Sequence, residues 1–152
     1  MAGGTGDGRD IMSSTTPGNP VAPAGKLAQA AGARRWAIPE GWIPSGGTGP
    51  EPAMASHETA CILNTGDTDA AVEVMLYFSD REPVGPYRVT VPARRTLHMR
   101  FNDLADPAPV PRDTDYASVL TSDVPVVVQH TRLDSRQAEN ALLSTMAYPL
   151  DS

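Results

Sequence analysis

The chain has 152 residues, of which 40% are hydrophobic and 20% are charged, and its formal net charge at pH 7 is −6. This composition is typical of a single globular domain. It excludes a membrane-spanning helix, because no window approaches roughly 18 to 20 consecutive apolar residues. The single cysteine, Cys61, excludes an internal disulfide, and its apolar surroundings in "ACIL" favour a packed thiol. Because the N-terminus lacks a basic stretch followed by an apolar core, we expect a cytoplasmic protein.

Residues 1–33 consist mainly of Gly, Ala, Pro, Ser and Thr. Such a segment has few large apolar side chains to repay the entropy of ordering. The sequence therefore predicts a flexible tail over residues 1–33 and one folded domain over residues 34–152.

From residue 36 to residue 104, short stretches with alternating hydrophobicity are separated by turn residues, a pattern typical of β-strands. "RRWAIPEG" and "GWIPS" contain proline and suit an edge strand or a loop crossing the sheet. "HETACILN", "AAVEVMLYFSD", "YRVTVPA" and "RTLHMRFNDL" read as four further strands. In the second of these, Val72, Val74 and Leu76 share one face, as period-two geometry requires.

The C-terminal third begins with a proline-rich loop, "ADPAPVPRDTD". We predict that "YASVLTSD" and "VPVVVQHTRLD" form a hairpin that turns at Asp123 and Val124. "SRQAENA", with Ser135 as its cap, is the one strong helix candidate, and "ALLSTMAYP" reads as a strand. About eight short strands with almost no helix predict an all-β protein, an antiparallel β-sandwich or barrel.

Motifs of common enzymes are missing from the sequence. It contains no GxSxG, no Walker-type phosphate loop, no HExxH and no pair of CxxC motifs. We therefore expect a protein without catalytic activity and without a bound cofactor.

The strand "VVVQHTRLDS" begins in apolar residues and ends with ionisable side chains on one face. His130, Arg132 and Asp134 alternate with Thr131 and Leu133, so they share a side. Either a buried strand runs out into water here, or a polar partner meets these side chains. Burying such charges unpaired costs several kcal/mol, so they must pair with one another or across an interface. "SHETACILN" carries His57 and Glu58, and we expect the two strands to lie close together, which makes the best ligand-site candidate a polar pocket of His57, Glu58, His130 and Arg132.

A second candidate site is "WAIPEGWIP", which places Trp36, Glu40 and Trp42 within seven residues. Exposed indole rings beside a carboxylate are typical of carbohydrate and small-molecule sites. The alternative is that both rings are buried and close the open end of the sandwich, and the sequence leaves these two interpretations open.

Metal and DNA sites have less support. A zinc site would need ligands scattered over three strands, namely His57, Glu58, His98, His130 and Asp134, and we predict no metal site. Residues 36–152 carry eight basic residues against sixteen acidic ones, which disfavours binding to a phosphate backbone. A local basic cluster, Arg94, Arg95, His98 and Arg100, is interpreted as a solvated strand end.

Several long stretches resemble one known family. They are "EGWIPSGGTGPEP", "SHETACILNTGD", "FSDREPVGPYRVTVPARRTLHMRFNDL" and "DPAPVPRDTDYASVLTSDVPVVVQHTRLDSRQAENALLSTMAY". Together they resemble the sensory rhodopsin transducers, small proteins that pair with a microbial sensory rhodopsin, from about Arg35 to Tyr148.

The resemblance implies a β-sandwich protomer that assembles into a homotetramer and lies in the cytoplasm beneath its receptor. It further implies that the protein carries the light signal of a membrane sensory rhodopsin by contact and is not a catalyst. The alternative function is a β-sandwich module that binds a carbohydrate or another small molecule, with a link to transcriptional regulation.

Overall fold

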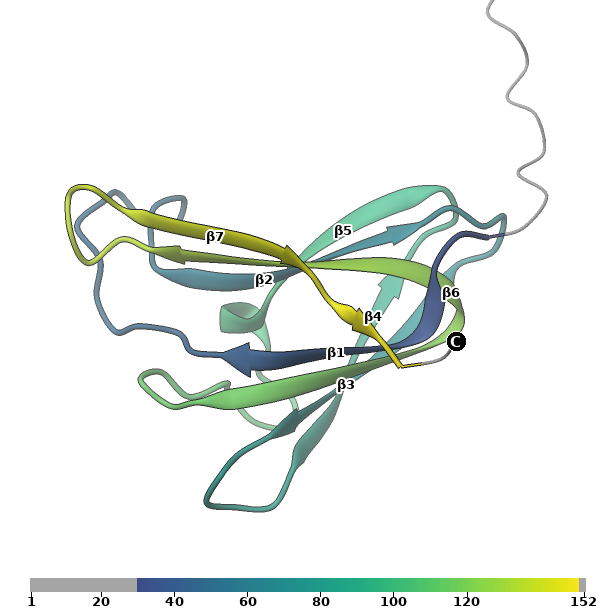
Figure 1. Ribbon diagram of the computed structural model, residues 1–152, viewed down its shortest axis with the longest axis horizontal. Coiled ribbons are helices and arrows are strands. Elements are labelled where there is room, and N and C mark those ends of the chain that lie inside the picture. The colour runs from purple at the N-terminus through teal and green to yellow at the C-terminus, as the bar shows by residue number, and fades with distance from the viewer. Residues whose placement is uncertain (1–29, 151–152) are drawn as a thin grey trace, which may run out of the picture.

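The computed structural model describes residues 30–150, and Figure 1 shows that strands account for nearly all of the regular structure in this part of the chain. The strands are β1 (Ala33–Gly41), β2 (His57–Asn64), β3 (Ala70–Tyr77), β4 (Val84–Val91), β5 (Arg95–Arg100), β6 (Tyr116–Asp134), β7 (Ala141–Met146) and β8 (Tyr148–Pro149). One 3₁₀ turn, η1 (Phe101–Asp103), follows β5. Every pairing is antiparallel, so the predicted all-β antiparallel fold is confirmed. No helix within residues 30–150 has the length and apolar character needed to cross a membrane.

The 19-residue strand β6 joins the two layers of the fold. Its first half pairs with β1 and β3, and its second half pairs with β2 and β7. In Figure 1, β6 runs along the lower layer, bends at the right and returns along the upper layer. The lower layer has the order β4-β3-β6-β1-β8, and in the upper layer β5 and β7 flank β2 and the second half of β6.

The predicted hairpin at Asp123 and Val124 is wrong, because the two halves of β6 lie in different layers and do not pair with each other. The ladder with β3 ends at Ser122, and the ladder with β2 begins at Val127. Asp123 accepts a hydrogen bond from the backbone N–H of Ala71 at 2.8 Å, and Pro125, which has no N–H to donate, lies in the gap between the two ladders. The chain therefore bends from one layer to the other within a single strand.

A single hydrophobic core fills the space between the layers. The predicted alternation in β3 is confirmed, because Val72, Val74 and Leu76 are buried whereas Glu73 and Tyr77 are exposed. The inward residues of all the long strands join one cluster, which includes Trp36, Ile38, Ile62, Tyr87, Val91, Met99, Leu120, Val126 and Val128. The core holds the two halves of β6 face to face, and this places the residues at their ends near one another.

The predicted helix over "SRQAENA" is also wrong, since residues 135–140 form a turn. Ser135 is fully buried and its N–H donates to Ser56 Oγ at 3.0 Å, so it does not cap a helix. Asp134 Oδ1 accepts the N–H of Arg136 at 3.1 Å, a local contact that favours a turn over a helix. The strand predicted over "ALLSTMAYP" is extended but divided: β7 ends at Met146 and pairs with β6, and after Ala147 the chain forms β8, which pairs with β1 in the other layer.

Several predicted strand boundaries shift in the structure. Strand β5 ends at Arg100, four residues earlier than the stretch assigned to it, because η1 follows directly. Ala33, assigned to the tail, opens β1 opposite Val126, and the N–H of Ala31 donates to Thr65 Oγ1 at 2.7 Å. Residues 1–29 of the predicted tail lie outside the described residues.

Candidate functional site

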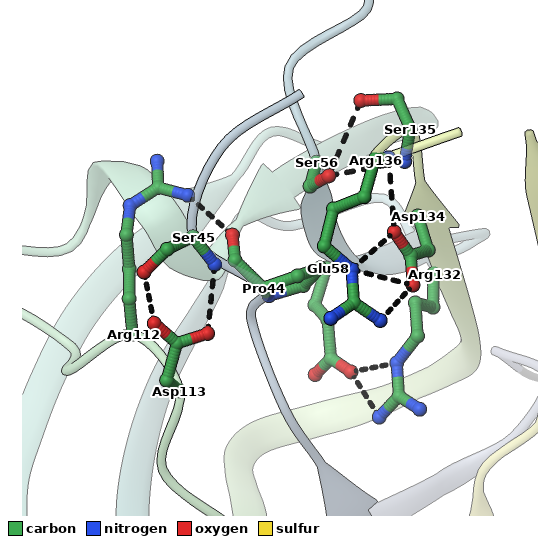
Figure 2. Close-up of polar contacts among 10 residues, drawn as sticks. All are labelled: Pro44, Ser45, Ser56, Glu58, Arg112, Asp113, Arg132, Asp134, Ser135 and Arg136. Carbon is green, nitrogen blue, oxygen red and sulfur yellow. Dashed lines mark hydrogen bonds and ion pairs between the residues drawn. The ribbon is translucent and has the colours of Figure 1, made fainter. Parts of the chain in front are cut away.

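The carboxylate of Glu58 projects inward from β2, is fully buried and has several charged and polar partners. Directly opposite it on β6 is Arg132, whose Nε and NH2 both lie 2.5 Å from Glu58 Oε1. The same oxygen accepts the backbone N–H of Trp42 at 2.9 Å, and Oε2 accepts the hydroxyl of Tyr116 at 2.7 Å. Figure 2 shows the guanidinium of Arg132 approaching Glu58.

Two more residues complete this group. His130 Nε2 is buried and lies 3.4 Å from Glu58 Oε2, too far for a well-formed hydrogen bond, and no other partner for it lies within residues 30–150. Glu40, which is mostly exposed, contacts the outer side of Arg132, with Oε1 2.5 Å from NH2. We call these residues, Glu40, Glu58, Tyr116, His130 and Arg132, the Glu58 cluster.

The surroundings of Glu58 keep it ionised despite its burial. Desolvation alone raises the pKa of a carboxyl group, because it disfavours the charged form. Here the contacts from His130, the Trp42 N–H, Tyr116 and Arg132 outweigh the burial, and the pKa of Glu58 is lowered from its ordinary value. Conversely, burial beside the Glu58 charge raises the pKa of Tyr116, so its hydroxyl remains a donor.

Arg132 is held between a buried and an exposed carboxylate. Burial opposes its charge, but hydrogen bonds to Glu40 and Glu58 prevail, and the pKa of Arg132 is raised. Its side chain is only 19% exposed. The cluster thus compensates a buried negative charge with a cation that reaches toward the surface.

The Glu58 cluster also connects the two layers of the sandwich. Glu58 and Arg132 belong to the upper layer, whereas Tyr116 begins the lower half of β6 and Trp42 follows β1. The Tyr116 ring packs on Phe101 with centroids 5.6 Å apart, in continuity with the core. A displacement of one layer against the other would therefore break hydrogen bonds to a buried charge.

The loops around the cluster are fastened by further polar contacts, several of which Figure 2 shows. Ser45 donates its N–H and its hydroxyl to Asp113, which lowers the pKa of Asp113. Arg112 donates to the Pro44 carbonyl at 2.9 Å. The Oγ atoms of Ser56 and Ser135 lie 3.2 Å apart, within hydrogen-bonding distance.

The predicted proximity of the two strands is confirmed, but the predicted pocket of four residues is not formed as expected. His57 lies on the opposite face of β2 from Glu58, since adjacent strand residues alternate. Its Nδ1 is 2.7 Å from the Ala55 carbonyl and 3.1 Å from Arg100 NH2. The sequence already implied that His57 and Glu58 point to opposite faces of the strand. Only the structure shows that Glu58 is the residue that points inward.

Asp134 pairs with Arg136 and not with Arg132. Arg136 approaches it through Nε and NH2, the latter at 2.7 Å, and this hydrogen bonding lowers the pKa of Asp134. The Arg136 guanidinium also lies over the Trp42 ring, 4.8 Å from its centroid, a cation–π contact. Arg136 therefore joins Trp42 and Asp134 in a second small cluster beside the first.

Trp36 is placed apart from these residues. Its side chain is buried at the bend of β6, where Nε1 donates to the carbonyls of Ala33 and Val126, both at 3.0 Å. The ring is part of the core and offers no exposed face to a ligand. Tyr116 was not predicted as a site residue. It shares the even-numbered face of β6 with His130 and Arg132, and this relationship is evident only when β6 is treated as one continuous strand.

The residues considered as zinc ligands are divided between the faces of the upper layer. Glu58 and His130 point inward, whereas His57 and the exposed His98 lie on the outer face. Within residues 30–150, no three His, Cys, Asp or Glu side chains are arranged to hold a metal ion.

Comparison with known proteins gives a consistent result. Residues 31–149 match the family described as Anabaena sensory rhodopsin transducer. A solved structure named Anabaena sensory rhodopsin transducer is 66% identical, with a TM-score of 0.61, and the alignment covers 67% of this chain and 99% of that one. The crystal structure of Thermotoga maritima 1070 is 36% identical, with a TM-score of 0.71 and coverage of 80% and 97%. No curated protein matches the chain. Because the family match spans most of the described residues, the chain belongs to the Anabaena sensory rhodopsin transducer family.

Proposed function

We propose that this protein relays the light signal of a membrane sensory rhodopsin by direct contact, as a cytoplasmic adaptor without catalytic activity. The observation that carries the proposal is the family match over residues 31–149, together with 66% identity to a protein named as a sensory rhodopsin transducer. The closed bonding of the Glu58 cluster agrees with a structural role for its charged residues, because both oxygens of Glu58 are occupied by partners from the chain itself.

A binding experiment with the full chain tests this proposal. A microbial sensory rhodopsin in lipid nanodiscs is titrated with the protein in the dark and under illumination, and a proton-pumping rhodopsin in identical nanodiscs is the control. We expect saturable binding to the sensory rhodopsin, a change in its photocycle kinetics and no binding to the control. Absence of binding in both light conditions, or equal binding to both rhodopsins, contradicts the proposal.

The protein is further proposed to act as a homotetramer. A small sandwich has edges with unpaired backbone groups, and association between copies is one way to cover them. Light scattering at micromolar concentration measures the mass in solution, and a monomer mass contradicts this part of the proposal.

A second candidate function is recognition of a sugar or another small molecule. A shallow hollow of about 350 Å³ lies beside Glu40 and is lined by Tyr77, Phe78 and Asp115 among others, and Tyr77 is 44% exposed. Exposed aromatic faces beside carboxylates favour sugars. Thermal-shift screening against a sugar panel, with Tyr77→Ala as the control, tests it; no shift beyond experimental scatter for any sugar contradicts it.

A further inference from the structure

Two carboxylates and three aromatic rings line the hollow beside Glu40, which we call the Glu40 hollow. The carboxylates belong to Glu40 and Asp115, and the rings belong to Tyr77, Phe78 and Tyr116. Its volume of about 350 Å³ lies at the lower end of the range for ligand pockets, roughly 300 to 1,000 Å³. The Glu40 hollow therefore suits a small ligand or a single long side chain.

Asp115 contributes an uncompensated negative charge to this hollow. It is exposed, and within residues 30–150 its carboxylate has no hydrogen-bond or ion-pair partner. The neighbouring Asp113, in contrast, accepts two hydrogen bonds from Ser45. A charge at a concave surface with apolar walls raises the local concentration of counter-ions. The carboxylate of Asp115 is thus available to a cation from solution.

Glu40 adds a second carboxylate that is only partly compensated. It contacts Arg132, but the same guanidinium nitrogen, NH2, lies 2.5 Å from Glu40 Oε1 and 2.5 Å from Glu58 Oε1. One cation is therefore shared between two carboxylates. Glu40 is also 60% exposed, so its other oxygen is open to the hollow's side of the surface.

The rings give the hollow a surface that attracts cations as well as apolar groups. The centroids of Phe78 and Tyr116 lie 6.4 Å apart with an angle of 52° between the ring planes, so the two rings form a corner. Tyr77 is 44% exposed. The face of an aromatic ring carries negative electrostatic potential and binds a cation within roughly 6 Å of its centroid.

Phe78 already makes a contact of this kind with a cation of the chain itself. The guanidinium carbon of Arg81 lies 5.0 Å from the centroid of the Phe78 ring. Arg81 is held there by its ion pair with Asp80 and does not line the Glu40 hollow. The other rings of the hollow have no such contact within residues 30–150.

We propose that the Glu40 hollow is a binding site for an organic cation, an alkylammonium or guanidinium group. The apolar part of the ligand packs on the rings of Tyr77, Phe78 and Tyr116, and its charge is compensated by Asp115 and Glu40. A neutral sugar could pack on the same rings but would leave Asp115 uncompensated. This inference goes beyond the signalling function proposed above and does not depend on it.

NMR titration of the full ¹⁵N-labelled chain with matched ligands tests the proposal. Choline is compared with 3,3-dimethyl-1-butanol, which replaces its cationic nitrogen with carbon, and methylguanidinium is compared with the neutral methylurea. We expect saturable chemical-shift changes at residues 39–41, 77–79 and 115–117 with both cations and none with the neutral partners. No saturable change with either cation, or equal changes with the neutral compounds, overturns the proposal.

Two substitutions at constant ionic strength assign the binding to the hollow. Asp115→Asn should raise the Kd of choline about tenfold, because it removes the unpaired charge. The matched control is Asp67→Asn, which removes the same charge from a surface pair with Arg94 and should leave the Kd unchanged. Tyr77→Leu should also weaken binding, since it keeps an apolar side chain but removes the ring. Equal effects of Asp115→Asn and Asp67→Asn would mean that net charge alone attracts the cation, and would overturn the site.

The cation could be a free small molecule or a basic side chain of another protein, and a peptide titration distinguishes these sources. The probes are capped Gly-Arg-Gly and its uncharged analogue with citrulline in place of arginine. Arginine-peptide binding at the same residues, tighter than that of methylguanidinium, supports a site for a protein side chain. Binding of the free cations alone supports a site for a small molecule. Equal binding of the arginine and citrulline peptides contradicts recognition of the charge.

Discussion

Glu58 and Arg132 lie directly opposite each other on β2 and β6, and their ion pair of 2.5 Å neutralises a carboxylate that has no exposed surface. Tyr116 and the Trp42 N–H bind the same carboxylate from the other layer. Arg132 therefore compensates the buried charge of Glu58. Through Tyr116 and Trp42, the same carboxylate also connects the two layers of the sandwich.

Replacing Arg132 with alanine should destabilise the protein strongly, by about 3 kcal/mol, because it leaves the buried Glu58 charge without its cation. Arg81→Ala is the matched control, since Arg81 pairs with Asp80 at the surface, where both side chains are about half exposed. It should leave stability almost unchanged. Urea unfolding of both variants measures the difference, and equal midpoints would contradict a structural role for the buried pair.

The stability of the protein should fall in acid, in part through Glu58. Its folded pKa lies below the ordinary value of 4.5, so below that pH the unfolded chain binds more protons than the folded one. The stabilisation is complete above pH 4.5 and is lost as the pH falls through the lower folded pKa. Asp113 and Asp134, whose pKa values are also lowered, add to the same slope.

Glu58→Gln should weaken this dependence, because the variant has no carboxyl group to protonate at this position. Urea unfolding free energies measured at a series of pH values, at and below about pH 4.5, give the slope for each protein. An unchanged slope in Glu58→Gln would show that the acid sensitivity comes from other carboxyl groups.

Tyr116→Phe should cost about 1.5 to 3 kcal/mol, the usual range for a hydrogen bond to a charged group. The aromatic ring remains to pack on Phe101, so the loss reports the 2.7 Å bond to Glu58. Tyr77→Phe removes an equivalent hydroxyl from a ring that is 44% exposed and serves as the control. Chemical denaturation should separate the two variants, and equal small effects would mean that the Tyr116 hydroxyl is dispensable.

Arg136→Ala should expose the Trp42 ring, because the guanidinium lies 4.8 Å from the ring centroid. Tryptophan emission should shift to longer wavelength, against a constant contribution from the buried Trp36. Arg88→Ala, which removes an exposed arginine paired with Glu73, should leave the spectrum unchanged. An unshifted spectrum in Arg136→Ala would show that the stacking does not persist in solution.

Some features were determined by the sequence alone, because they depend on short-range geometry. The alternation of Val72, Val74 and Leu76 sets one face of β3 whatever its neighbours are. The same period places His130 and Arg132 on one side of β6. The pairing of "HETACILN" with the strand of His130 and Arg132 was also predicted, since ionisable residues at the end of an apolar strand require partners.

Other features were decided only by the tertiary structure, because they depend on residues far apart in the chain. The segment from Asp123 to Pro125 has the local sequence of a turn. Pairing with β3 before it and with β2 after it nevertheless keeps β6 one continuous strand that passes from one layer to the other. Ser135 resembles a helix cap, but its bond to Ser56, 79 residues away, holds a turn instead. The inward direction of Glu58 rather than His57 was likewise set by its contacts with Arg132, Tyr116 and Trp42. Local pattern fixes the period of a strand, whereas the choice of its buried face depends on the partners that folding brings to it.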